Sequence, residues 1–230
     1  HEFAQPRGSI ALAFDGDCLW VANSLSNDVA KIRVSDGTTL GTYPVGRFPI
    51  ALAYDGFHIW VVNNASETVT ELRISDGSVA ATFPTGHAPT GIAFDGASMW
   101  VANSADNTVM KLRARDGAVL GVFPVGKSPQ GVAFDGANIW VANNLSNDVT
   151  KLRASDGFSA GTFPVGSAPT GVAFDGTYVW VTNTGSGTVM RLRSNGATAG
   201  DFPVGNSPYG VAFDGVAIWV TNRGSDTVTK

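Results

Sequence analysis

The chain of 230 residues carries 19 Asp and Glu against 15 Lys and Arg, which gives a net charge of −4. This acidic balance argues against a nucleic-acid-binding protein, because such proteins present a clustered basic face. The single cysteine, Cys18, excludes an internal disulfide and a zinc site built on thiolates. No apolar run in the sequence is long enough to cross a bilayer. We therefore expect neither nucleic acid nor a membrane among the partners.

One unit of about forty residues recurs along the whole chain. The tryptophans mark it with spacings of 40, 40, 40, 40 and 39 residues: Trp20, Trp60, Trp100, Trp140, Trp180 and Trp219. A fixed period of this length is typical of stacked or circular repeat proteins. Repeats that cannot bury their own faces bury each other's, so we expect one domain over residues 1–230 and an indole wedged between each pair of neighbouring sheets.

Within a unit, four short apolar runs are separated by turn signals. In residues 129–168 the runs cover 131–134, 139–142, 149–152 and the residues up to Phe163. Asp135-Gly136 closes the first run and predicts a tight turn, since glycine accepts positive φ at no steric cost. Pro164 ends the last run, and a proline suits the end of a strand or an outer edge because it cannot donate to the ladder. Four strands in forty residues, repeated, predict the four-stranded antiparallel blade of a β-propeller.

The two chain ends indicate how the ring closes. The repeats cover 9–48, 49–88, 89–128, 129–168, 169–207 and 208–230. The last unit has only three strands, and Phe3 falls at the position of Tyr43 in the next unit. We therefore expect residues 1–8 to complete the last blade, with His1–Gln5 as its outer strand, because pairing the two ends removes open sheet edges. The sequence thus predicts an all-β, six-bladed β-propeller. The alternative is that His1–Phe3 is a cloning remnant.

Basic residues recur on the third strand of the units. They are Lys31 and Arg33, Lys111 and Arg113, Lys151 and Arg153, and Arg191 and Arg193. Apolar residues alternate with them, which is the pattern of a half-exposed strand. We interpret these basic residues as a solvated rim.

Residues with metal-binding or acid–base chemistry fall mainly in turns. His58 lies in a first turn and His87 in an inter-blade loop, so a propeller places them on opposite faces and they cannot pair. Aspartates recur at the first and third turns, and all of them fall on one face: Asp15, Asp55, Asp95, Asp135, Asp175, Asp214, Asp36, Asp76, Asp116 and Asp156. Backbone hydrogen bonding in a tight turn explains most of them. We expect no metal and no cofactor, with Ca²⁺ or Mg²⁺ on this acidic face as the alternative.

The opposite face of a propeller is the usual ligand face. Its inner ring consists of the residues that follow each blade opening: Ile10, Ile50, Thr90, Gln130, Thr170 and Tyr209. Asparagines end the second strand nearby: Asn23, Asn63, Asn103, Asn143, Asn183 and Asn222. Because an amide both donates and accepts, we predict a neutral polar mouth around the channel, with Thr90, Gln130, Thr170, Tyr209 and the six asparagines as its candidate ligand-binding residues. The alternative is that the asparagines only shape turns.

The second strand reads Trp-Val-Thr-Asn at 180–183 and 219–222, and Trp-Val-Ala-Asn in three other units. With the preceding Pro-x-Gly-(Ile/Val)-Ala-Phe-Asp-Gly segment, it resembles the YVTN family of β-propeller repeats. It is also similar to NHL-type propellers and to the virginiamycin B lyase (streptogramin lyase) family, over essentially the whole chain. Lyases of that family place histidines directly after the blade-opening proline and a glutamate at the end of the second strand. Only Ile, Thr, Gln, Tyr and Asn occupy the matching positions here, so the resemblance implies the fold and no catalytic residue.

We therefore expect a non-catalytic, monomeric scaffold that binds a small ligand, a glycan or a protein segment at the channel mouth. One alternative is a metal-dependent lyase or hydrolase related to virginiamycin B lyase, with its cation on the acidic face or at the channel. Another is a purely structural repeat protein, amplified or engineered. Many YVTN and NHL-like units belong to larger extracellular bacterial proteins, so the resemblance implies a secreted or periplasmic location.

Overall fold

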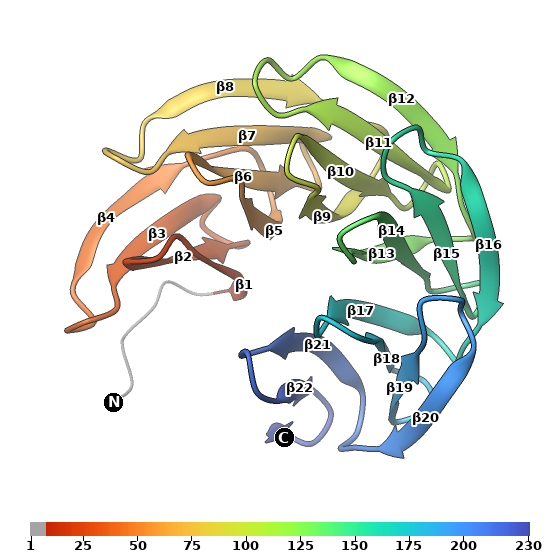
Figure 1. Ribbon diagram of the computed structural model, residues 1–230. Coiled ribbons are helices and arrows are strands. Elements are labelled where there is room, and N and C mark those ends of the chain that lie inside the picture. The colour runs from red at the N-terminus through yellow and green to blue at the C-terminus, as the bar shows by residue number, and fades with distance from the viewer. Residues whose placement is uncertain (1–7) are drawn as a thin grey trace.

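The computed structural model describes residues 8–230, and its strands form six separate sheets arranged around a common axis (Figure 1). Each sheet is one blade, numbered here in chain order. Each repeat contributes one blade, as the sequence predicts, and blades 1 to 5 are four-stranded and antiparallel. Within this range no helix could span a membrane.

The strands of each blade follow one another along the chain. Blade 1 contains β1 (Ser9–Phe14), β2 (Cys18–Asn23), β3 (Asp28–Arg33) and β4 (Thr39–Pro44). Blade 2 contains β5 (Pro49–Tyr54), β6 (His58–Asn63), β7 (Thr68–Arg73) and β8 (Val79–Pro84). Blade 3 contains β9 (Pro89–Phe94), β10 (Ser98–Asn103), β11 (Thr108–Arg113) and β12 (Val119–Pro124). Blade 4 contains β13 (Pro129–Phe134), β14 (Asn138–Asn143), β15 (Asp148–Arg153) and β16 (Ser159–Pro164). Blade 5 contains β17 (Pro169–Phe174), β18 (Val179–Asn183), β19 (Thr188–Leu192) and β20 (Thr198–Pro203). Blade 6 contains β21 (Pro208–Phe213), β22 (Ile218–Asn222) and β23 (Thr227–Thr229).

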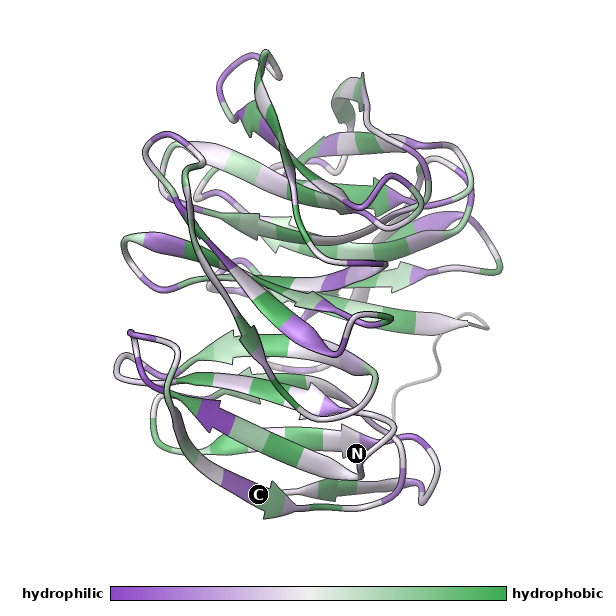
Figure 2. Cartoon of the chain, turned by 90° about the vertical axis from the view of Figure 1, so that its right-hand side faces the viewer, coloured by the Kyte–Doolittle hydropathy of each residue, from purple (hydrophilic) through white to green (hydrophobic). Residues whose placement is uncertain are grey.

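The core lies between the blades. Trp100 on β10 packs against Ile139 and Leu152 of blade 4, and the equivalent contacts join blades 1 and 2, 2 and 3, and 4 and 5. Apolar residues follow the strands, and hydrophilic residues gather in the turns (Figure 2). An aromatic residue of the fourth strand stacks on the tryptophan of its own blade, as Phe83 does on Trp60 with ring centroids 5.5 Å apart. The indoles of blades 1 to 4 are therefore core residues that join each of these blades to the next, as the spacing predicts.

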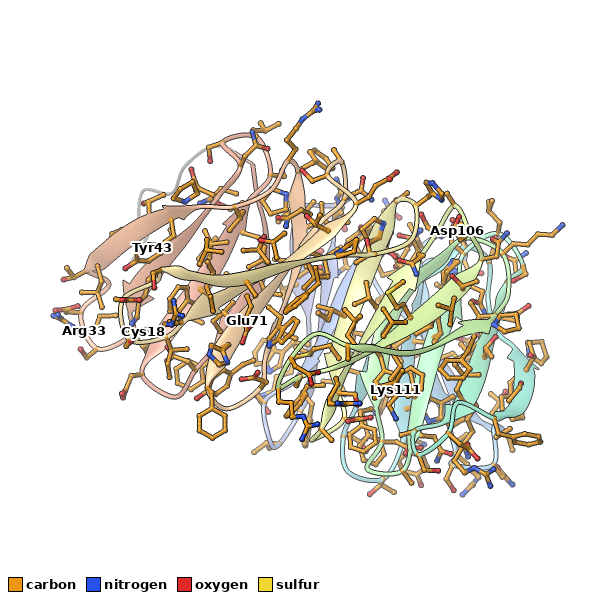
Figure 3. The ribbon with its side chains drawn as sticks, turned by 90° about the horizontal axis from the view of Figure 1, so that it is seen from above. Cys18, Arg33, Tyr43, Glu71, Asp106 and Lys111 are labelled. Atoms are coloured by element: carbon orange, nitrogen blue, oxygen red, sulfur yellow. The ribbon has the colours of Figure 1, made fainter. Side chains whose placement is uncertain are left out.

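The basic residues of the third strand do not all form a solvated rim. Arg33, Arg153 and Arg193 are exposed, as the alternation predicts. Lys111 is buried, and its ammonium donates to the carbonyl of Ala154 in the next blade over 2.6 Å (Figure 3). The lysines at this position reach between two sheets, where an intramolecular carbonyl replaces water as their partner. The rim prediction is wrong for them.

The junction between blade 6 and blade 1 differs from the others. The first strands of consecutive blades lie side by side from β1 to β21. Between blade 6 and blade 1 lies a cavity of about 440 Å³, lined from one side by Ser9 and Ile10 and from the other by Thr221 and Arg223. Leu12 is 63% exposed and Trp219 is 37% exposed, although their counterparts elsewhere are at least half-buried. This junction is open within residues 8–230, and the closing strand predicted for His1–Gln5 lies outside the described residues.

Candidate functional site at the central channel

The first strands of the blades surround a cavity of about 460 Å³ on the axis. Thr90, Gln130, Thr170 and Tyr209 all line it, together with the two isoleucines of blades 1 and 2 at the same position. Alternation along a strand explains this, because the residue after the blade-opening proline turns its side chain toward the axis. The structure thus brings together four of the ten predicted site residues.

The threonine hydroxyls in this ring already bind neighbouring blades. Thr90 Oγ1 donates to the carbonyl of Pro129 over 2.9 Å, and the Thr170 hydroxyl lies 3.2 Å from the carbonyl of Tyr209. These contacts connect the first strands of blades 3 and 4 and of blades 5 and 6. The two threonines therefore stabilise the ring, and their hydroxyls have less capacity for a ligand.

Polar groups with unused bonding capacity gather on one side of the channel mouth. Gln130, Tyr209 and Arg223 line a second cavity of about 650 Å³ that adjoins the first. The Arg223 guanidinium lies 4.8 Å from the centre of the Tyr209 ring, in cation–π contact. Within residues 8–230, neither the Tyr209 hydroxyl nor the Arg223 guanidinium makes a hydrogen bond. To the described residues, the Gln130 side-chain amide donates one weak bond, to the Ser128 hydroxyl over 3.3 Å.

Arg223 is the functional candidate that the sequence reasoning missed. The other units carry small polar residues at its position: Ser24, Asn64, Ser104, Asn144 and Thr184. A single basic residue that breaks a repeat pattern of this kind is a signal that the sequence does contain. Its significance depends on the contact with Tyr209 of β21, since Arg223 itself directly follows β22.

The six asparagines lie elsewhere. Each is buried, with at most 1% of its surface exposed, so its amide does not reach the channel. The Asn143 amide donates to the carboxylate of Asp148 over 2.6 Å and to the hydroxyl of Thr150 over 2.9 Å. Asn63 makes the equivalent bonds to Thr68 and Thr70. These side chains hold the turn between the second and third strands.

The two histidines of the described chain lie in separate places. His87, in the loop between β8 and β9, pairs with Asp106, in the turn between β10 and β11, at 2.8 Å, and Figure 3 shows Asp106. His58 is the first residue of β6 in blade 2, and its Nδ1 lies 2.9 Å from Glu71 Oε1. The Asp106 hydrogen bond and charge raise the pKa of the exposed His87.

No protein-family model and no curated protein sequence matches the chain. Solved structures do match it. A streptogramin B lyase structure superposes with a TM-score of 0.83 at 17% identity, covering 99% of this chain and 84% of the lyase. Virginiamycin B lyase from Staphylococcus aureus gives 0.83 at 19% identity, covering 97% and 80%. This chain has the fold of the virginiamycin B lyase structures. A functionally unknown protein from Desulfotomaculum acetoxidans gives 0.78 at 13% identity, covering 93% and 78%. At these identities the likeness concerns the fold alone.

Proposed function

We propose that the protein is a non-catalytic binding scaffold whose ligand occupies the central channel and its polar mouth. The observation that supports this proposal best is the group formed by Gln130, Tyr209 and Arg223, whose bonding capacity the fold leaves largely unused. Uncommitted polar groups around a concave, otherwise apolar surface are typical of a small-molecule site.

The side chains that line the channel do not support lyase activity. The inner ring holds Ile, Thr, Gln and Tyr where the lyase resemblance expects histidine. Asparagine occupies every position where that resemblance expects glutamate, and each of these asparagines is buried. A general base has to lie within hydrogen-bonding reach of the proton that it removes, and among residues 8–230 no ionisable carboxylate or imidazole lines this cavity.

The chemistry of the mouth indicates the class of ligand. Arg223 is a permanent cation with a planar guanidinium that matches a carboxylate, and the Tyr209 hydroxyl and the Gln130 amide are suited to hydroxyl groups. A carboxylated sugar combines both kinds of group. We therefore propose a carboxylate-bearing glycan or small molecule as the ligand. Separately, the resemblance to YVTN and NHL-like repeats leads us to propose that this is a secreted or periplasmic bacterial protein.

The experiment is a binding screen against neutral and carboxylated oligosaccharides, followed by calorimetry on the best of them. Arg223→Ser introduces the residue that two other units carry at this position, so the blade is expected to fold. It should weaken binding by at least about tenfold, since a charge-assisted hydrogen bond to a carboxylate is lost. Arg193→Ser, in the third turn of blade 5, is the matched control and should bind like the wild type. Equal binding by both variants, or no binding of any carboxylated sugar, would contradict the proposal.

A further inference from the structure

A basic side chain lies over the tryptophan in five of the six blades. The pairs are Lys31 on Trp20, Lys111 on Trp100, Lys151 on Trp140, Arg191 on Trp180 and Lys230 on Trp219, at 5.0 to 5.5 Å from the ring centre. The ammonium groups of blades 1, 3 and 4 also donate to a carbonyl of the following blade. The fold therefore repeatedly places a positive charge between an indole face and the next sheet.

Blade 2 departs from this pattern. Glu71 pairs with Trp60 across β6 and β7, in the register that pairs Lys111 with Trp100 in blade 3. Glu71 is only 8% exposed, and among residues 8–230 no cation lies over Trp60. The carbonyl that corresponds to those bound by the lysines is that of Ala114, which lines the same cavity as Glu71. A buried carboxyl group thus occupies the place where the other blades hold a basic side chain.

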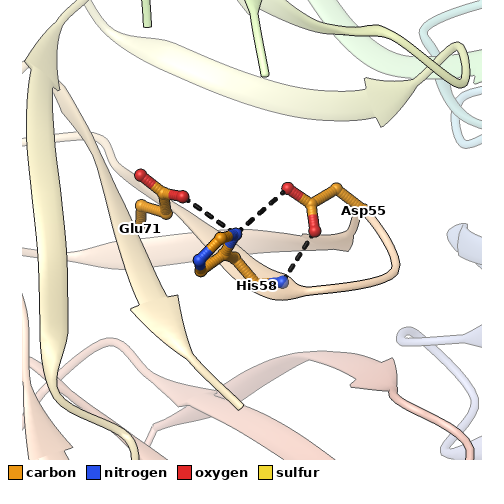
Figure 4. A group of neighbouring side chains, drawn as sticks. All are labelled: Asp55, His58 and Glu71. Atoms are coloured by element: carbon orange, nitrogen blue, oxygen red, sulfur yellow. Dashed lines mark hydrogen bonds and ion pairs between the residues drawn. The ribbon is translucent and has the colours of Figure 1, made fainter. Parts of the chain in front are cut away.

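Three potential metal ligands converge at this position (Figure 4). His58 Nδ1 lies 2.9 Å from Glu71 Oε1 and 3.5 Å from Asp55 Oδ2, and the three ligand atoms lie within 4.8 Å of one another. Ligands of a tetrahedral zinc ion at bond lengths of about 2.0–2.1 Å are about 3.3 Å apart. The observed separations of the imidazole nitrogen from the two carboxylate oxygens bracket that value.

The Asp55 carboxylate is held in place by its own turn. Its Oδ1 accepts hydrogen bonds from the backbone amides of Phe57 and His58, and its Oδ2 accepts one from the Trp60 indole over 2.8 Å. Oδ2 keeps a lone pair for a further partner. Hydrogen bonds of this kind orient a ligand before the metal arrives, which strengthens the site.

The cluster opens onto a cavity of about 900 Å³ between blades 2 and 3. Lys111, Arg113 and Arg115 line the other side of this cavity. An ion held by three protein ligands at such a place keeps a coordination position open to water or to an anion, as catalytic and ligand-binding zinc sites do. The basic wall opposite favours an anion there.

Burial raises the pKa of Glu71, and the charge of Asp55 acts in the same direction, while His58 opposes them. His58 faces two carboxylates, and a divalent cation between the three side chains would neutralise both of them.

We propose that Asp55, His58 and Glu71 bind one divalent metal ion of the zinc class, which supplies the positive charge that a lysine or arginine supplies in the other blades. One imidazole nitrogen and two carboxylate oxygens favour Zn²⁺ over Mg²⁺ or Ca²⁺, which prefer oxygen ligands alone. The site lies on the acidic face of the fold, away from the channel mouth, and it does not depend on the ligand proposed there.

The test measures Zn²⁺ binding by calorimetry at pH 7.5 in a buffer that does not chelate, and records the absorption spectrum of the Co²⁺ form. The wild type should bind one equivalent of Zn²⁺ at this site and should show the visible bands of four-coordinate Co²⁺. Glu71→Lys and His58→Ser each install a residue that another blade carries at the same position, so both should fold. Each should weaken Zn²⁺ binding by at least about 100-fold, because one of three ligands is lost.

Glu71→Lys also tests the metal-free protein. Without metal, the melting temperature of this variant should equal or exceed that of the wild type, because the new lysine places an ammonium group over Trp60, as lysines do over the tryptophan in blades 1, 3 and 4. His87→Ala is the control, since His87 pairs with a single carboxylate among residues 8–230, and this variant should bind Zn²⁺ like the wild type. A wild type that takes up no Zn²⁺ overturns the proposal. Unchanged Zn²⁺ binding in Glu71→Lys or His58→Ser overturns it as well.

Discussion

The Trp140 indole donates a hydrogen bond to the Asp135 carboxylate over 2.7 Å, and the equivalent bond recurs in all six blades at 2.6–2.8 Å. The other oxygen of Asp135 accepts bonds from the backbone amides of Ala137 and Asn138. One carboxylate therefore closes the first turn and fixes the core indole at the same time. The recurring first-turn aspartates therefore have a structural role in every blade, and in blade 2 Asp55 combines this role with the free lone pair on Oδ2 described above.

Asp135→Asn should destabilise the fold. An amide presents an oxygen to only one side, so its NH₂ group would face either the indole N–H or the turn amides, and one buried donor would lose its acceptor. We expect a loss of about 1–3 kcal/mol in the free energy of unfolding, measured by urea denaturation. Asp17→Asn is the control, since the Asp17 side chain is exposed and should tolerate the change. Equal midpoints for the two variants would contradict this account.

Stability should fall at acid pH for the same reason. Burial raises the pKa of Asp135, but hydrogen bonds from Trp140 and from the turn amides outweigh it and leave the pKa below its usual value. Similar bonds hold the pKa of Asp214 at about 2. A carboxylate whose pKa is lower in the folded chain stabilises the fold above the unfolded-state pKa of about 4, and this stabilisation is lost as the pH falls toward 2.

Urea denaturation at several pH values between 7 and 2 measures this loss. The curve for the wild type should be flat above about pH 5 and should decline below pH 4. Asp135→Asn should decline less steeply, because one titrating group is gone. A wild-type curve that stays flat to pH 2 would show that these hydrogen bonds do not stabilise the charged carboxylates.

The third-turn glycine of one blade lies against the outer aromatic ring of the previous blade. A Cβ on Gly117 would lie 2.0 Å from Cε1 of Phe83, the ring that stacks on Trp60. Gly117→Ala should therefore destabilise the fold by about 1–3 kcal/mol through the steric clash alone. The left-handed backbone conformation, which is unfavourable for alanine, adds a further cost. Gly96→Ala is the matched control, because Gly96 also has a positive φ of 96° but nothing lies within 4 Å of its Cβ position. In thermal unfolding, the melting temperature of Gly96→Ala should lie between those of the wild type and Gly117→Ala.

Leu12 and Leu52 occupy the same position in blades 1 and 2, and they test the open junction. Leu52 packs against the cluster around Trp20, whereas Leu12 is 63% exposed. Leu52→Ala should lower the free energy of unfolding by about 2 kcal/mol, and Leu12→Ala by less than about 0.5 kcal/mol. Chemical denaturation of both variants gives the comparison. A loss as large in Leu12→Ala would indicate that another segment covers the junction, as the sequence prediction for residues 1–8 requires.

Much of this protein could be predicted from the sequence. The tryptophan period indicates the number of blades, and the Asp-Gly turns and the terminal prolines mark the strand ends. The channel lining follows from the position after each blade opening, since strand alternation determines which side chains face the axis. These features are local, and repetition makes the local signal strong.

Only the tertiary structure decided which polar residues are available. Asn143 and Gln130 look equally suited to a ligand in the sequence, yet one is buried in bonds to its own turn and the other lines the channel. The convergence of His58 with Glu71, and of Arg223 with Tyr209, depends on strand pairing across a blade. The sequence determined the repeat and its blade because these depend on neighbouring residues. The sites depend on residues brought together from separate strands, and this proximity is set by sheet register.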